Sequence, residues 1–137
     1  MLIGSSTTSV TFTNASNCTV ATGQWVDPWT GLNFTAATDV DIDHTVALAN
    51  AHRSGGWSWT TTQKRDYAND LANPDALRPM DDGTNVVKGD KGPDEWKPPL
   101  ASSWCAYATD WATIKVRWTL TVTATEYAAL DSMLSLC

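Results

Sequence analysis

The sequence of 137 residues lacks several features that mark well-known protein classes. It has no apolar run near the roughly 20 residues that a helix needs to cross a bilayer, and no internal repeat that would indicate a solenoid. None of its three cysteines is spaced as C-x-x-C, so the sequence does not support a zinc ribbon or a thioredoxin-like redox motif. No signal-peptide pattern is visible either. We therefore expect a globular chain with no membrane partner.

Basic residues are also scarce, with nine Lys and Arg against fifteen Asp and Glu and a formal net charge of -6. Proteins that hold nucleic acids by their phosphates usually carry a basic surface. Any nucleic-acid binding should therefore be weak, salt-sensitive and of low sequence specificity. A local basic rim can still form on an acidic protein. Six of the nine basic residues fall close together in the chain: Lys64, Arg65, Arg78, Lys88, Lys91 and Lys97.

Apolar residues make up 42% of the chain, and tryptophan alone occurs eight times. This content excludes extended disorder and is enough for a substantial core. The length favours one domain over residues 1–137. We expect an α+β fold and a monomer.

Acidic and apolar residues alternate over residues 40–46, which predicts a strand. On that strand Asp41 and Asp43 share one face, while Ile42 and His44 share the other. Residues 76–80 are predicted to form a second strand in a hairpin, and Pro79 would place it at a sheet edge or end it early. Short strands are also predicted over 9–13 and 33–35.

Helices are predicted over 47–53, from a Thr60–Gln63 cap through Ala68, and over 85–88. A helical turn is expected over 93–96. The C-terminal part, about 101–137, is predicted to be a helical scaffold, with Thr125 as the cap of a helix over 126–136. Residues 116–122 also alternate, so an extended segment is an alternative there.

The pair Asp43–His44, together with Asn85 and Lys88, contains the groups that phosphodiester hydrolysis requires. One divalent cation can neutralise the phosphate and assist the leaving oxygen. Magnesium prefers oxygen ligands and keeps several waters, so one oxygen each from Asp43 and Asn85 would suffice. His44 has the pKa range of a general base, and Lys88 can hold a phosphate oxygen as a point charge.

The motif Asp-x-Asp-His-x-Val, followed by Asn-x-x-Lys-Gly-Asp, resembles the HNH, or His-Me finger, nucleases. More closely, the chain resembles the secreted HNH family related to the C-terminal domain of GmrSD restriction endonucleases. The resemblance covers most of the chain. Its stretches are 18–20, 23–31, 41–48, 53–56, 67–70, 85–90, 96–99, 105–107 and Cys137.

This resemblance implies a ββα-metal core over about 38–97 with additional helices. It implies one Mg²⁺, or alternatively Mn²⁺, held by Asp43 and Asn85, with His44 as general base and Lys88 at the phosphate. Asp41, Asp90 and Lys91 would surround these residues, and Asn69 would brace the metal loop. The substrate would be a nucleic acid, with DNA expected before RNA. In that family further sequence with another cysteine precedes the matching part, which leaves Cys18 without an expected partner.

Each of these residues also has a plain structural explanation. Asp43 and His44 can simply end a surface strand, and Asn85 can be a helix cap, a common use of asparagine. Lys88 and Lys91 can be solvated charges. Asp41 and Asp90 can hydrogen-bond a neighbouring group, and Asn69 can end a helix.

Three functions therefore compete with a nuclease. The domain can bind nucleic acid without cutting it, or it can hydrolyse another phosphate ester with the same ligands. It can also be a secreted structural domain stapled by a disulfide. We expect a bridge between Cys105 and Cys137, and the cysteines together with the resemblance favour secretion. An intracellular protein with incidental cysteines is the alternative.

Overall fold

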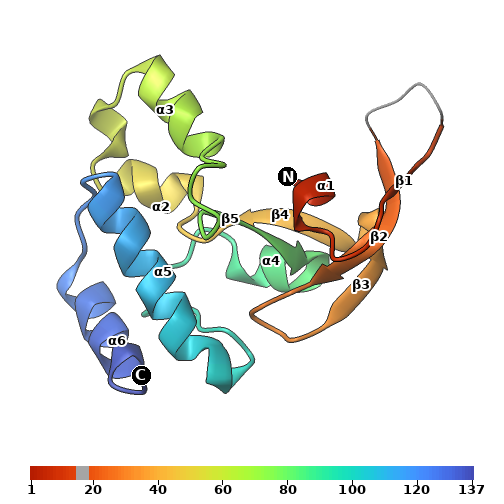
Figure 1. Ribbon diagram of the computed structural model, residues 1–137. Coiled ribbons are helices and arrows are strands. Elements are labelled where there is room, and N and C mark those ends of the chain that lie inside the picture. The colour runs from red at the N-terminus through yellow and green to blue at the C-terminus, as the bar shows by residue number, and fades with distance from the viewer. Residues whose placement is uncertain (15–18) are drawn as a thin grey trace.

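The structure, a computed structural model, describes residues 1–14 and 19–137. It combines α-helices with two small antiparallel sheets, which confirms the α+β class (Figure 1). One sheet has the order β1–β2–β3, formed by Thr11–Phe12, Val20–Val26 and Asn33–Ala36. The other consists of β4, Val40–His44, and β5, Leu77–Asp81.

The helices gather mainly on one side of the molecule. In Figure 1, α2, α3, α5 and α6 lie on the left and the three-stranded sheet on the right, while β4, β5 and α4 lie between them. The helices are α1 Leu2–Ser5, α2 Leu48–Arg53, α3 Thr61–Ala68, α4 Asp82–Lys88, α5 Trp104–Arg117 and α6 Ala124–Leu134. Short 3₁₀ turns occur at Ala37–Asp39, Gly56–Ser58 and Ala101–Ser103.

Strands β4 and β5 pair antiparallel over their full length, from Val40 opposite Asp81 to His44 opposite Leu77. The two predicted strands are therefore confirmed, but no tight turn joins them. The connecting residues 45–76 contain α2 and α3 instead. Pro79 lies on β5 within this two-stranded sheet, where an outer edge tolerates its missing N–H.

Helix caps explain both the successes and the errors of the predicted boundaries. The Thr60 side chain accepts from the Gln63 N–H and the Gln63 side chain reciprocates, so the predicted capping box of α3 is confirmed. Helix α4 begins at Asp82 rather than 85, because the Asp81 side chain accepts from the Thr84 N–H at 2.8 Å.

Two predictions for the C-terminal part were wrong. Thr123, not Thr125, caps the last helix, because Thr123 and Glu126 form the reciprocal pair of a capping box. The extended segment predicted as an alternative over 116–122 is also wrong, because α5 continues through Arg117 and residues 118–123 form neither helix nor strand. The predicted helical turn over 93–96 is a hydrogen-bonded turn that the Gly92 carbonyl closes.

Helix α5 supplies one wall of the main core. Its buried positions repeat every three or four residues, as expected for an amphipathic helix, and they are Tyr107, Ala108, Trp111, Ile114 and Lys115, with Asp110 beside them. The apolar ones pack with Trp29, Tyr67, Met80 and Met133, among others. The predicted Cys105–Cys137 disulfide is confirmed, with Cα atoms 5.4 Å apart, and it joins the start of α5 to the chain end after α6. Cys18 lies outside the described residues.

Candidate functional site

Strand β4 and helix α4 face each other with matching polar side chains. Asp41 and Asp43 project from the same face of the strand because side chains alternate, while Asn85 and Lys88, three residues apart, project from one face of the helix. The Asn85 Nδ2 donates to Asp41 Oδ2 at 2.9 Å, and Lys88 Nζ donates to Asp43 Oδ1 at 2.7 Å. Three of the four residues that the sequence singled out, Asp43, Asn85 and Lys88, therefore take part in two contacts between β4 and α4, with Asp41 as the fourth partner.

Asp43 is almost completely buried, at 4% exposure. Burial raises the pKa of Asp43 to about 6, and the Lys88 ammonium offsets only part of that effect. Its second oxygen, Oδ2, is buried and has no hydrogen-bond partner within the part of the chain that the structure describes. Buried polar atoms are nearly always paired, so this oxygen is an electron-pair donor without a protein partner.

Lys88 is completely buried, at 0% exposure. Its ammonium donates to Asp43 Oδ1 and also to the His44 carbonyl at 2.9 Å. Because both contacts lie at the end of β4, Lys88 fixes the backbone and side chain of the two residues that carry the motif. The structure thus gives Lys88 contacts with Asp43 and the His44 backbone, and its predicted contact with a phosphate stays a prediction.

His44 is half-buried, and a backbone carbonyl orients its ring. Its Nε2 lies 3.1 Å from the Ala68 carbonyl oxygen, which can only accept, so Nε2 carries the proton and Nδ1 is the basic nitrogen. The Tyr67 ring stacks at 6.3 Å. Burial lowers the pKa of His44 below its ordinary value, and the Lys88 charge lowers it further. The imidazole is therefore neutral near pH 7.

Sequence reasoning missed two residues that shape this site. The Ala68 carbonyl has no sequence signature, because every residue carries one. Asp27 is completely buried, and its carboxylate accepts from the N–H groups of Trp29 at 2.7 Å and Asp81 at 3.1 Å. It therefore ties the turn after β2 to the residue that caps α4. The Asp-Pro-Trp-Thr-Gly turn was the available signal for it.

A second carboxylate lies next to Asp41 at the start of α4. The Asp41 charge raises the pKa of Asp82, an exposed residue in the first turn of α4. Like charges that approach each other favour protonation of one of them, or a cation between them. The acidic side of the site therefore extends from Asp43 along the strand to Asp82.

The predicted surrounding residues divide into one that joins the site and three with other partners. Asp41 contacts Asn85, as described above. Asp90 forms an exposed ion pair with Arg53 at 2.5 Å. Asn69 donates from its side chain to the Arg65 carbonyl at the end of α3, and the Lys91 ammonium donates to the Val87 carbonyl. The structure thus gives Asp90, Asn69 and Lys91 local contacts instead of site contacts.

Two oxygen atoms at this site are of the chemical kind that a magnesium-like ion binds, and the set of such residues is small. Within residues 1–14 and 19–137 there is no group of three or more His, Cys, Asp or Glu side chains placed to hold a metal. Magnesium needs only one or two protein carboxylates and keeps its waters. The unpaired Asp43 Oδ2 supplies one oxygen, and Asn85 offers Oδ1 because its Nδ2 is engaged by Asp41.

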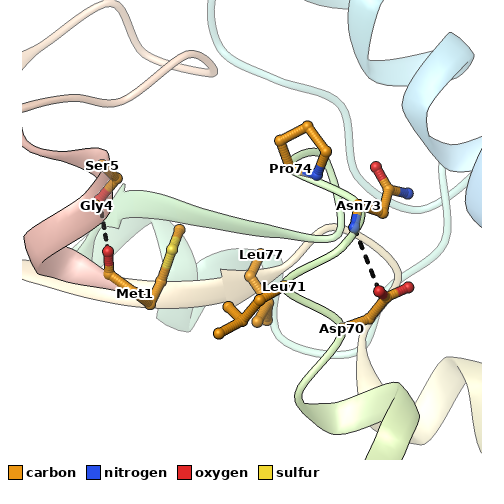
Figure 2. A pocket seen from close by; sticks show the side chains of 8 residues that line it. All are labelled: Met1, Gly4, Ser5, Asp70, Leu71, Asn73, Pro74 and Leu77. Atoms are coloured by element: carbon orange, nitrogen blue, oxygen red, sulfur yellow. Dashed lines mark hydrogen bonds between the residues drawn. The ribbon is translucent and has the colours of Figure 1, made fainter.

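A cavity of about 390 Å³ lies on the other face of the β4–β5 sheet (Figure 2). Leu77, which pairs with His44 across the strands, lines it together with Leu71 and Met1. Its one acidic residue, Asp70, is already used by the Asn73 N–H and by Arg117. We assign no chemistry to this cavity, because its free surface is mainly apolar.

The chain is similar to a protein of Arthroderma benhamiae described as an uncharacterized secreted protein. The two sequences are 49% identical over 121 residues, which cover 88% of this chain and 59% of that protein. This chain therefore spans less than two thirds of its relative's length. No protein-family model matches the chain, and no solved structure matches it.

The relative supports the expected localisation. It is described as secreted, and the Cys105–Cys137 disulfide is typical of proteins in oxidising compartments. The prediction of a secreted protein is therefore confirmed. No helix within the described ranges is long and apolar enough to span a bilayer.

Proposed function

We propose that this secreted chain is a metal-dependent endonuclease of the HNH, or His-Me finger, type. It would hydrolyse phosphodiester bonds in DNA, and alternatively RNA, with low sequence specificity. The observation that carries the proposal is a buried Asp43 carboxylate with one unpaired oxygen, followed in the sequence by His44, whose imidazole the Ala68 carbonyl orients. The order β4, β5, α4 and the packing of α4 on both strands also agree with a ββα-metal core.

His44 would act as the general base. The Ala68 carbonyl holds the proton on Nε2, so Nδ1 can take a proton from the attacking water. Tyr67 fixes the ring from the side, and its hydroxyl is itself anchored to the Val46 carbonyl at 2.5 Å. The lowered pKa keeps Nδ1 unprotonated near neutral pH. The base is therefore in the correct tautomer and charge state before substrate arrives.

Asp43 and Asn85 would hold the divalent ion through Oδ2 and Oδ1. When bound, such an ion neutralises charge on the phosphate and assists the departing oxygen. Lys88 keeps Asp43 in place through its contact with Oδ1, which directs the free oxygen away from the lysine. Asp41 orients the Asn85 amide in the same way, because it accepts from Nδ2 and leaves Oδ1 for the ion.

The test uses supercoiled plasmid, which reports a single nick as a relaxed circle. Wild-type protein is incubated with Mg²⁺, with Mn²⁺ and with EDTA, beside His44→Ala and Asn85→Ala variants whose folding is checked by circular dichroism. We expect the wild-type protein to nick the plasmid only when metal is present, and His44→Ala to abolish nicking. The Asn85→Ala variant should nick only at a higher metal concentration than the wild-type protein needs.

Three outcomes would contradict the proposal. Metal-dependent nicking that survives His44→Ala would remove the histidine from its role. A folded wild-type protein that cuts neither plasmid nor RNA with any metal would leave a binding or structural domain. Cleavage of a small phosphodiester but not of plasmid would identify a hydrolase of another phosphate ester.

A further inference from the structure

Another, smaller cavity of about 190 Å³ lies between helices α2 and α3. Each helix turns one side toward it. Leu48 and His52 lie four residues apart on α2, and Lys64, Tyr67 and Ala68 share one face of α3. Trp59 and Gly56 close the end where the 3₁₀ turn joins the two helices.

This cavity and His44 share two walls. Tyr67 stacks on the His44 ring, and Ala68 supplies the carbonyl that orients it. Both residues also line the cavity. A group bound there would therefore lie one side chain away from the proposed base.

The cavity has a rigid aromatic wall. The Trp59 ring packs at 5.2 Å from Tyr67 and at 5.5 Å from Trp118, so two other rings hold it in place. Gly56 makes room for it, because a Cβ there would lie 3.0 Å from the Trp59 ring and 2.8 Å from the Ala51 carbonyl oxygen. Ligand cavities for larger molecules measure roughly 300–1,000 Å³, so this one suits a single planar ring.

The charge at the rim is positive on an otherwise acidic protein. His52 and Lys64 are exposed, and the residues that line the cavity include no acid. Among the described residues no carboxylate forms an ion pair with Lys64. A flat apolar wall with a free cation at its edge is complementary to a base and its phosphate.

We propose that this cavity, named here the α2–α3 pocket, binds one unstacked nucleobase next to the scissile phosphate, with Lys64 on the adjoining phosphate. This inference rests on the proposed nuclease and deepens it, because a base can enter only after leaving the duplex stack. The preferred substrate is therefore single-stranded or locally opened nucleic acid.

The test measures binding separately from cleavage. His44→Ala protein in Mg²⁺ is titrated into a short fluorescein-labelled single-stranded DNA, into the duplex of the same sequence, and into a strand with abasic residues. We expect the intact single strand to bind about ten-fold more tightly than either alternative, in line with base stacking on aromatic rings.

Two matched pairs of variants, made in the His44→Ala protein, test whether the preference for a single strand comes from the α2–α3 pocket. Lys64→Gln should weaken binding and lower the salt dependence by about one counterion, whereas Lys97→Gln, away from the pocket, should not. Trp59→Leu and Trp118→Leu both remove a ring from the cluster around Tyr67. Both should lower stability, but only Trp59→Leu should abolish the preference for a single strand.

Equal binding of the single strand, the duplex and the abasic strand would contradict the proposal that the α2–α3 pocket binds a nucleobase. So would a Lys64→Gln variant that behaves like Lys97→Gln. Either result can occur while plasmid nicking proceeds as proposed, so the pocket alone would fail. If binding follows the expectation but nothing is cut, the pocket stands and the proposed hydrolysis fails.

Discussion

Two lysines are buried in this protein, and their surroundings differ in one respect. Lys115, at 2% exposure, donates to the Asn50 Oδ1 at 2.8 Å, to Ser54 Oγ and to the Thr121 carbonyl, and it pairs with Glu126 at 3.0 Å. Lys88 pairs with Asp43 and the His44 carbonyl, but Asp43 retains an unpaired buried oxygen. The Lys115 cluster is saturated, since its charged groups all have partners, whereas the Lys88 cluster is open, since Asp43 keeps one oxygen without a partner.

The difference is the one expected between a structural cluster and the site that we propose. Both carboxylate oxygens of Glu126 accept hydrogen bonds, from the Trp111 indole, from Lys115 and from the Thr123 N–H. Neither oxygen is therefore left unpaired for a ligand. A fully satisfied buried network makes the fold specific. An unsatisfied buried carboxylate costs free energy in the folded protein, which is tolerated where a ligand completes it. The Lys115 cluster therefore holds α2, α5 and α6 together, whereas the Lys88 cluster stays open in the sense that Asp43 Oδ2 has no partner among the described residues.

The largest expected effect is at the open cluster. His44→Ala should lower the rate of plasmid nicking by about 10²–10⁴-fold, since it removes a general base. The free energy of unfolding should fall by only about 1 kcal/mol, since one hydrogen bond to Ala68 is lost. Cleavage kinetics and urea unfolding on the same preparations measure both. A variant that loses stability but keeps its rate would place His44 in the scaffold.

The saturated cluster should respond in the opposite way. Lys115→Met leaves Glu126 buried without its cation and should cost about 3–5 kcal/mol of unfolding free energy. The rate of nicking per folded molecule should not change. Urea unfolding checks the first statement, with Lys97→Met as an exposed-lysine control. A cost near that of the control would show that the Lys115 network contributes little.

Removal of the disulfide is a second test of how the same C-terminal region contributes to stability. Cys105 and Cys137 are 32 residues apart, and opening a loop of that size should cost about 3–4 kcal/mol in the chain-entropy account. The double variant with serine at both positions should unfold at lower urea concentration. We expect its nicking rate per folded molecule to stay at the wild-type value, because the bridge lies in the helical part. Loss of activity without loss of stability would contradict that separation.

The smallest effect is expected at an exposed pair. Arg65 and Asp66 form an ion pair at 3.1 Å, with side chains 68% and 53% exposed. Arg65→Gln should change the unfolding free energy by about 0–1 kcal/mol. Thermal or urea unfolding measures it. A loss as large as that of Lys115→Met would mean that burial does not explain the contrast between these charges.

Local patterns predicted much of the fold. The alternation in β4 placed Asp41 and Asp43 on one face and His44 on the other, and the Thr60 capping box fixed the start of α3. The errors occurred where two local signals competed. Thr123 and Thr125 are both cap candidates two residues apart, and only the reciprocal contact with Glu126 decides between them.

The candidate site was predictable as a set of side chains but not as an arrangement. The sequence named Asp43, His44, Asn85 and Lys88. It could not show that Lys88 would be fully buried against Asp43, since burial depends on which elements cover that face. The orienting carbonyl of Ala68 lies 24 residues from His44 and carries no sequence pattern.

The sequence by itself determined the periodic faces, the caps and the residue types near β4 and α4, because these depend on neighbours within a few positions. The tertiary structure decided the rest. It left one oxygen of Asp43 unpaired, saturated Lys115 and opened a pocket between α2 and α3. These features arise from contacts between distant segments, and the free energy of a buried polar atom depends on whether such a contact forms.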